Sequence, residues 1–433
     1  MKKILIISYF FPPSTFTGSF RIYSWAKYLS RFGWYPIVVT RRWDFPVSEY
    51  KDMSATTSSE ILHQQFDGYE VYSLPYKGNL RDRLHEKYGE RKMVTFRKML
   101  SFFEVIGQNF TTRVVPFRNL YIFSDDLLKK DPDIKCMITS GKPYVLFSFC
   151  HKLSKKHHIP WVSDYRDDWS TSQWLTNLSF RDRLIANLEK RSELKWLASA
   201  SGFTTISPAY VDLITGFIKK PGFSIMNGFD PDDYAGLPET TGNKAFTIIF
   251  NGTLYESQPV EIFTEAFRKF VHTAASKGDI KLLFLGLDFE KQQADRVRGL
   301  LQGLEPYYQI TGRVEKKKAL EIMAAAHVFL MFSHTNIKGV TSSKIFDYLA
   351  LGKPVILSPG DKEILEEIIN TTHSGFVCEN SEKILIVLQA LFDEYLSSGN
   401  INDKRDVNSI TNYSRINQTK KLAEALNTLI KGK

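Results

Sequence analysis

SKIFDYLALGKPVI, residues 343–356, is the stretch that decides the fold. Ser343 and Lys344 begin a predicted short helix, Gly352 ends it, and an apolar strand follows directly. A helix that turns tightly into a buried strand is typical of a doubly wound parallel sheet. Lys344 lies in the first helical turn, where free backbone N–H groups favour an anion, and Asp347 follows on the same face. The segment therefore predicts an α/β fold and a site for a polar, anionic ligand.

The same alternation of strand and helix patterns extends over both halves of the chain. We expect strands at residues 4–10, 36–40, 70–73, 134–140, 161–165 and 202–206, and again at 246–251, 281–287, 308–311, 328–333, 354–357 and 375–378. Helical patterns separate most of these strands, which implies right-handed crossovers and parallel sheets. The prediction is an α/β protein with two doubly wound domains.

A chain of 433 residues is too long for one ordinary core, which also favours two domains. The junction is expected near the turn-rich segment 227–233, NGFDPDD. We predict a first domain over 1–226, a second over 227–411, and a terminal helical segment over 412–433.

Composition narrows the class of protein. A hydrophobic content of 43% excludes a disordered chain, and a net charge of +10 points to anionic partners. The three cysteines, Cys136, Cys150 and Cys378, lack metal-ligand spacing, which favours a reducing compartment without disulfides. No apolar run is long enough to cross a bilayer, and Pro12-Pro13 ends the first apolar run without a cleavage site for a signal peptide. We therefore expect a cytoplasmic protein.

Lys344 and Asp347 together suit a nucleotide sugar. The lysine and the helix N-terminus would hold the diphosphate, while the carboxylate would accept hydrogen bonds from ribose or hexose hydroxyls. The segment, with Ser343, resembles the nucleotide-sugar signature of family 4 glycosyltransferases. These are retaining enzymes of the GT-B architecture, in which two Rossmann-like domains face each other across a cleft. The resemblance also implies that the terminal helix, expected over 412–433, crosses back onto the first domain.

The resemblance implies an activity as well as a fold. It implies a hexosyltransferase-type enzyme that moves a sugar from a nucleotide donor to a hydroxyl of a glycan or lipid-linked glycan, with retention, in cell-surface polysaccharide biosynthesis. It also implies that no metal or other cofactor is needed, because cationic groups and helix termini stabilise the departing diphosphate.

Further donor-binding positions follow from the same resemblance. They are Gly18 in the loop after the first strand, Gly252 and Thr253 after strand 246–251, and Arg313 after strand 308–311. Two departures stand out. The stretch 253–258 lacks the arginine and lysine common in relatives, and Gly339 replaces the first of two carboxylates in the family's motif.

The segment 161–169, WVSDYRDDW, is the candidate for acceptor chemistry because a buried strand delivers charged residues at its carboxyl end. Arg166 would bind an anion or brace a carboxylate, and Asp167 or Asp164 would orient or deprotonate the acceptor hydroxyl. The alternative is an internal ion-pair network of these residues. His151, in a helical stretch, is expected to be exposed or satisfied within the core.

Residues 76–120 depart from a compact Rossmann pattern by mixing basic and aromatic residues in a helical insertion. Two interpretations stand side by side. One is a contact with an anionic membrane surface or a groove for a lipid-linked acceptor, which would place the protein peripherally on the inner face of the cell membrane; the other is an ordinary helix pair packed on the first domain. No nucleic-acid-binding motif accompanies the charge, so nucleic acid is not an expected partner.

Other functions remain open at this stage. A sugar-nucleotide epimerase can share the fold. A nicotinamide oxidoreductase is disfavoured, because no Gly-x-Gly-x-x-Gly turn follows residues 4–10. A non-catalytic nucleotide-binding protein would explain the missing cations at 253–258.

Overall fold

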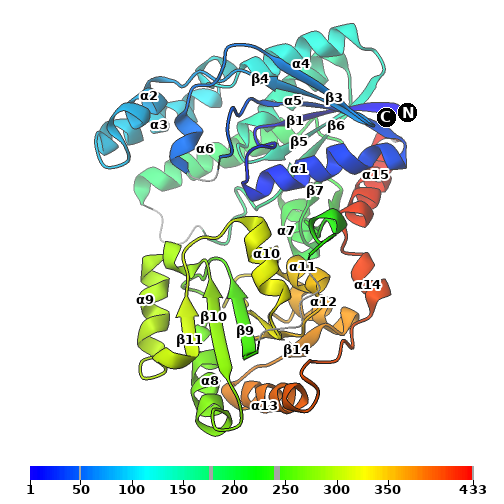
Figure 1. Cartoon of the computed structure of the whole chain (residues 1–433). Helices are drawn as coiled ribbons and strands as arrows, with labels where there is room; N and C mark the ends of the chain where they lie inside the picture. The colour runs from blue at the N-terminus through cyan, green and yellow to red at the C-terminus, as the bar shows by residue number, and fades with distance from the viewer. Residues whose placement is uncertain (48–49, 175–178, 238–243, 432–433) are drawn as a thin grey trace. The chain divides into compact units, whose positions relative to one another are not determined.

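A computed structural model of the chain describes residues 1–47, 50–174, 179–237 and 244–431. The chain divides into two compact units, of which the first comprises Met1–Met226 and Gln418–Lys433 and the second Asn227–Asn417. Each unit has its own sheet of largely parallel strands with helices around it (Figure 1).

The first unit contains an eight-stranded sheet in the order β3-β4-β2-β1-β5-β6-β7-β8. Its strands are β1 Lys2–Ser8, β2 Trp34–Arg41, β3 Leu62–Phe66, β4 Tyr69–Leu74, β5 Ile134–Gly141, β6 Trp161–Tyr165, β7 Gly202–Thr205 and β8 Gly222–Ser224. Its helices are α1 Thr17–Tyr28, α2 Leu80–Tyr88, α3 Val94–Gln108, α4 Asn119–Lys130, α5 Val145–His157, α6 Phe180–Leu197, α7 Pro208–Ile218 and the terminal α15 Arg415–Lys431, most of which lies in this unit.

The six strands expected in the first half are confirmed, and two edge strands were missed. Most of the predicted strands are buried along their length, as in residues 4–7 of β1, which form an apolar run and are all 0% exposed. The missed strand β3, LHQQF, is exposed throughout and pairs antiparallel with β4. The missed strand β8 has only three residues. Both lack the apolar run by which a buried strand is recognised.

The second unit contains a six-stranded sheet in the order β11-β10-β9-β12-β13-β14, and every pairing in it is parallel. Its strands are β9 Phe246–Asn251, β10 Ile280–Leu285, β11 Tyr308–Ile310, β12 Val328–Met331, β13 Val355–Leu357 and β14 Gly375–Val377. Its helices are α8 Val260–Ala274, α9 Lys291–Leu300, α10 Lys316–Ala324, α11 Lys344–Leu351, α12 Ile364–Thr372, α13 Ser381–Ser398 and α14 Val407–Thr411.

Each sheet has one point at which the strand order reverses. Within each unit the central six strands follow the doubly wound order 3-2-1-4-5-6, so the reversal lies between β1 and β5 in the first unit and between β9 and β12 in the second. Ligands of such sheets bind beyond the carboxyl ends of the strands at the reversal. Residues at these two edges are therefore the candidates for ligand binding.

The terminal helix α15 contributes to the core of the first unit. Leu422, Leu426 and Leu429 join the cluster on one face of the sheet that contains Ile4 and Ile6 of β1. In addition, the Met226 backbone N–H donates to the Gln418 side-chain oxygen at 2.7 Å. The first unit is thus built from two stretches of chain that are far apart in sequence.

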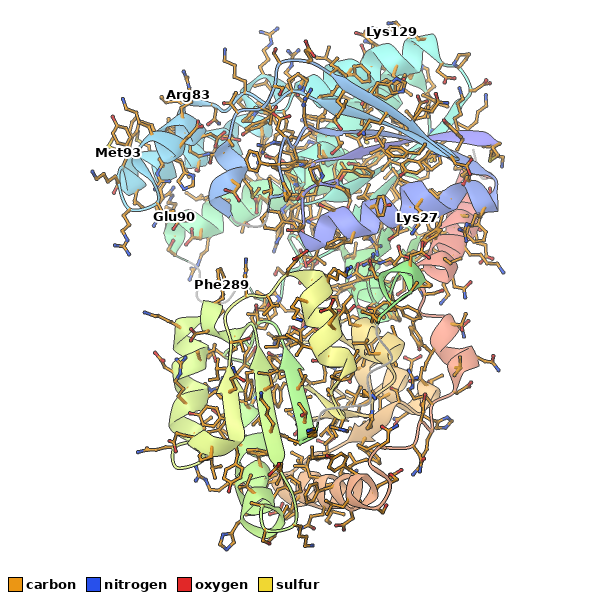
Figure 2. The ribbon with its side chains drawn as sticks, in the orientation of Figure 1. Lys27, Arg83, Glu90, Met93, Lys129 and Phe289 are labelled. Carbon is orange, nitrogen blue, oxygen red and sulfur yellow. The ribbon has the colours of Figure 1, made fainter. Side chains whose placement is uncertain are left out.

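Residues 76–120 contain the helix pair α2 and α3. Asn79 caps α2 through reciprocal hydrogen bonds with Asp82. The other helix, α3, has no buried residue, and its exposed side chains include Phe96, Met99 and Phe103. Figure 2 shows Arg83 on α2, and Glu90 and Met93 at the connection between the two helices. No helix in the described ranges is both long and apolar enough to span a bilayer.

Candidate functional site

Residues 343–356 form the predicted helix, stop and strand. Helix α11 begins at Lys344 after Ser343, ends at Gly352 with a φ of 80°, and leads into β13. Ser343 is exposed, and its side chain forms no capping hydrogen bond. The local structure predicted from the sequence is confirmed here.

Lys344 extends from α11 to the turn after β9. Its Nζ donates a hydrogen bond to the Thr253 carbonyl at 2.6 Å and lies 4.1 Å from the centroid of the Phe250 ring. Gly252 in that turn has a φ of 86°, and a Cβ there would lie 3.3 Å from Lys344 Cε. A residue without a side chain is therefore favoured at position 252. The structure brings Lys344, Gly252 and Thr253 together at the carboxyl end of β9, beside the strand reversal.

The ammonium group of Lys344 is held in an environment that disfavours its charge. Burial lowers the pKa of Lys344 to about 7. His334, in the loop after β12, feels the same charge: burial and then Lys344 lower the pKa of this histidine to about 4. Its Nδ1 is hydrogen-bonded to the Ser257 hydroxyl at 2.7 Å. A bound anion would remove the electrostatic cost of the Lys344 charge.

Sequence reasoning missed His334 and Ser257. The available signal was their position, since His334 follows β12 and Ser257 follows β9, the two strands at the reversal. Thr341, in the loop before α11, was also missed. It is 6% exposed, and its hydroxyl has no hydrogen-bond partner in the described part of the chain.

Asp347 has a different partner from Lys344 although both lie on α11. The Tyr234 hydroxyl donates to Asp347 Oδ1. Burial raises the pKa of the Asp347 carboxyl, and the Tyr234 hydrogen bond, Lys316 and Arg415 act in the opposite direction. Tyr234 donates to one oxygen of the carboxylate, so a ligand hydroxyl would donate its hydrogen bond to the second oxygen.

Two further positions of the predicted donor site lie on loops of this unit. The Arg313 guanidinium lies 3.6 Å from the centroid of the exposed Phe289 ring. Gly339, at the place of the missing family carboxylate, donates its backbone N–H to Glu363 Oε2 at 2.7 Å. The Glu363 carboxylate, from another loop, thus accepts a hydrogen bond from the backbone at position 339.

In the first unit, Asp164 is an interior residue. It is 0% exposed, and Arg21 binds its carboxylate with a shortest distance of 2.7 Å. The hydroxyls of Ser140 and Thr204 donate to the same carboxylate at 2.7 and 2.8 Å. With no exposed atom to meet an acceptor, Asp164 fits the internal ion-pair alternative and not the catalytic role. The prediction also missed its cation, because Arg21 and not Arg166 is the partner.

Arg166 lies against Gly18. A Cβ on Gly18 would clash with the Arg166 guanidinium, which donates from Nε to the Gly141 carbonyl at 2.8 Å. Asp167 beside it is exposed, and its carboxylate lies 3.7 Å from Lys142 Nζ. Gly18, predicted for donor binding, and Arg166, predicted for catalysis, are therefore neighbours at the strand reversal of the first unit.

His151 is satisfied within the core, as expected. It is 6% exposed, and its Nδ1 is hydrogen-bonded to the Ser199 hydroxyl at 2.9 Å. Burial, followed by Lys155, lowers the pKa of His151.

A cavity of about 410 Å³ lies at the edge formed by the carboxyl ends of the strands of the first unit. It is lined by Tyr9, which follows β1, and by Tyr76, which follows β4. Its wall includes the basic side chains Arg81, Arg97, Lys98 and His85 and one carboxylate, Asp82. Arg81 is paired with Asp82 at 2.9 Å and with Glu104 at 3.1 Å. The remaining wall is cationic and suits an anionic or hydroxyl-rich molecule.

Comparison with known proteins agrees with this geometry. Residues 245–393 match the family model described as Glycosyl transferases group 1, which covers α11 and the turn around Gly252. No curated protein matches the chain.

Solved structures match over the whole chain. An alpha,alpha-trehalose-phosphate synthase (UDP-forming) from Burkholderia vietnamiensis matches with a TM-score of 0.62 at 10% identity, over 100% of both chains. A sucrose-phosphate synthase from Thermosynechococcus elongatus matches with a TM-score of 0.61 at 13% identity, over 100% of both chains. The HepE protein of Anabaena, in complex with UDP and glucose, matches with a TM-score of 0.58 at 13% identity, over 99% of this chain and 100% of its own.

At these identities the likeness establishes the fold, and the predicted fold class is confirmed. The chain has the GT-B fold of two α/β domains, and residues 245–393 of its second unit are similar to the glycosyl transferases group 1 family.

Proposed function

We propose that the protein is a glycosyltransferase, of the family 4 and hexosyltransferase type, that moves a sugar from a nucleotide diphosphate sugar to an acceptor hydroxyl with retention of configuration. The observation that carries this proposal is the placement of Lys344 over the Gly252 turn. It puts a partly buried cation at the carboxyl end of β9, where a doubly wound sheet binds its ligand.

The donor contacts follow from that placement. The Lys344 ammonium would bind the diphosphate together with backbone N–H groups at the start of α11, and the Thr341 hydroxyl lies close by in sequence to add a hydrogen bond. The second oxygen of Asp347 would accept from a ribose or hexose hydroxyl. In this proposal the leaving diphosphate is stabilised by these groups without a metal.

The acceptor would bind at the corresponding edge of the first unit. Asp167 is the exposed carboxylate there, with Arg166 and Lys142 beside it. We propose that Asp167 orients the acceptor hydroxyl and that the cationic cavity near Tyr9 receives part of the acceptor. The acceptor would be a glycan or lipid-linked glycan of cell-surface polysaccharide biosynthesis.

We also propose a cytoplasmic enzyme that contacts an anionic membrane through α3. This helix buries none of its residues, and Phe96, Met99 and Phe103 are exposed beside the basic residues Lys98 and Arg97. Apolar and basic side chains on one helix suit the membrane interface. Such a contact would bring the acceptor edge of this unit close to a lipid-borne substrate.

Donor binding should take up a proton. The free Lys344 has a pKa of about 7, and a bound diphosphate raises that pKa by attraction. At pH 8, where the free lysine is mostly neutral, we expect uptake of about one proton per nucleotide sugar and weaker binding as pH rises. Calorimetry in buffers of different ionisation enthalpy measures the uptake. A diphosphate diester does not titrate in this range, so uptake that persists in Lys344→Ala would contradict the assignment.

The proposal is tested with purified protein and a panel of UDP-, ADP- and GDP-sugars. Binding is followed by thermal shift, because a ligand that binds only the folded state raises its stability. The donors that bind are then tested for sugar transfer and for retention of configuration by NMR. Asp167→Asn should keep donor binding and the thermal transition but reduce transfer by about 100-fold or more, as loss of a positioned acid–base group does. Unchanged transfer would exclude Asp167 from the acceptor site.

A nucleotide-binding protein without transferase activity is the second candidate. It is favoured by the stretch 253–258, which contains no lysine or arginine to share the phosphate charge with Lys344. Donor binding without transfer or epimerisation to any acceptor in the panel would support it.

A further inference from the structure

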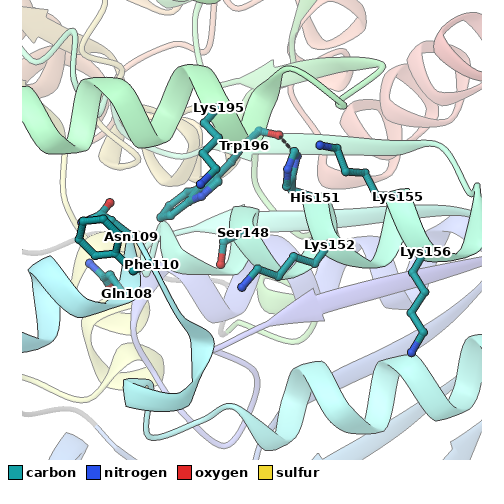
Figure 3. A pocket seen from close by; sticks show the side chains of 10 residues that line it. All are labelled: Gln108, Asn109, Phe110, Ser148, His151, Lys152, Lys155, Lys156, Lys195 and Trp196. Atoms are coloured by element: carbon teal, nitrogen blue, oxygen red, sulfur yellow. Dashed lines mark hydrogen bonds between the residues drawn. The ribbon is translucent and has the colours of Figure 1, made fainter.

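A second basic pocket lies on the first unit, outside both strand reversals. Its volume is about 350 Å³, and it lies between α5, α6 and the turn that follows α3. The residues around it are Gln108, Asn109, Phe110, Ser148, His151, Lys152, Lys155, Lys156, Lys195 and Trp196 (Figure 3). No carboxylate is among the described residues that line it.

The lysines of this pocket differ in whether their charge is balanced. Lys156 pairs with Asp125 at 2.7 Å, and in Figure 3 it points away from the others. Lys152 extends from α5 and Lys195 from α6, and both side chains line the pocket (Figure 3). In the described ranges neither of them, nor Lys155, forms an ion pair.

These lysines act on one another and on His151. Burial and then Lys195 lower the pKa of Lys152. Lys155, Lys195 and Lys152 all contribute to the lowered pKa of His151. Repulsion between these like charges is unfavourable, and an anion between them would be attracted to each of them.

The neutral residues show what else such an anion would meet. The Asn109 amide is already used, since it donates to the Val105 carbonyl and accepts from Ser192. Ser148 donates to the Val145 carbonyl at 2.8 Å. The lysine ammonium groups therefore remain as the main donors. Phe110, which is 76% exposed, and Trp196 supply an apolar wall.

We propose that this pocket binds a phosphate group carried by a small organic molecule, with Lys152 and Lys195 as its ligands. The charge and the lack of a carboxylate select an anion, and the volume, with the apolar wall, leaves room for the remainder of a phosphate ester. The site is distinct from the Lys344 site, which lies in the other unit, and does not depend on the proposed transferase activity.

The test uses the full chain carrying Lys344→Ala, which silences the proposed diphosphate site. Calorimetry with inorganic phosphate and with glycerol 3-phosphate should show binding. Lys152→Gln with Lys195→Gln should weaken that binding at least tenfold, whereas Lys152→Arg with Lys195→Arg should retain it. The glutamine pair should melt no lower than its parent, because a repulsion has been removed. Lys130→Gln with Lys190→Gln, two exposed lysines of the same unit outside the pocket, is the matched control and should bind as its parent does.

Vesicles distinguish a free ester from a lipid headgroup. Sedimentation with phosphatidic acid vesicles, but not with phosphatidylcholine vesicles, that is lost in the glutamine pair would identify the phosphate as a headgroup. Binding of glycerol 3-phosphate without such sedimentation would identify a soluble ester. The proposal is overturned if none of the three phosphate probes binds, or if the glutamine pair binds them as tightly as its parent.

Discussion

Replacing Lys344 by alanine is expected to weaken binding of the nucleotide sugar by about 10- to 150-fold. The reason is the loss of a charge-assisted hydrogen bond to the diphosphate, worth about 1.5–3 kcal/mol. Lys344 already points at the Gly252 turn, where its Nζ is held by the Thr253 carbonyl. The Lys344 side chain therefore needs little rearrangement to bind the diphosphate, so most of the free energy of this hydrogen bond contributes to the binding affinity. Calorimetry with the best donor of the panel measures the change.

The control is Lys317→Ala, an exposed lysine of α10 in the same unit. This variant changes the net charge by the same amount as Lys344→Ala. Its affinity for the nucleotide sugar should stay within about twofold of the wild-type value, since exposed charges are screened. Asp347→Asn should weaken binding of the sugar nucleotide more than that of the free nucleoside diphosphate if its carboxylate acts on the hexose. Wild-type affinity in Lys344→Ala would show that the diphosphate binds elsewhere.

Breaking the buried pair of Arg21 and Asp164 is expected to lower the free energy of unfolding by about 3–5 kcal/mol, because it leaves one charge uncompensated in the interior. The two side chains are 2% and 0% exposed. Asp164→Leu leaves the Arg21 guanidinium without its carboxylate, and Ser140 and Thr204 lose an acceptor. Urea unfolding, followed by circular dichroism, measures the loss.

A double variant separates structure from catalysis. Arg21→Met with Asp164→Leu removes both charges and should recover much of the stability lost in Asp164→Leu alone, because paired apolar replacements are often tolerated. If Asp164→Asn kept its stability but lost sugar transfer, Asp164 would instead be a catalytic residue.

The elements that the sequence predicted well are those with a local cause. Helix α11 has its basic first turn and its Gly352 stop within one short segment, and the strands at residues 161–165 and 246–251 are rich in apolar residues and largely buried, with observed bounds that agree with the prediction. Edge strands are only half covered and carry polar residues, so β3 gave no such pattern.

The parts of the site that were missed depend on distant partners. The segment around Asp164 predicts a charged residue at a strand end, but the arginine that pairs with Asp164 is 143 residues away in sequence, on α1. Tyr234 meets Asp347 across 113 residues, and no spacing rule connects them. Lys344 was found because its position in a helical first turn is itself a local feature, whereas its contact with Thr253 required the sheet order that joins β9 to β12.

The terminal helix makes the order of synthesis matter for folding. Because Leu422, Leu426 and Leu429 close the core over Ile4 and Ile6, the core around β1 cannot be completed until residues that follow the whole second unit have been synthesised. The second unit is contiguous and can fold while the first still exposes apolar surface. The nascent first unit is therefore the part of this chain most in need of chaperone protection.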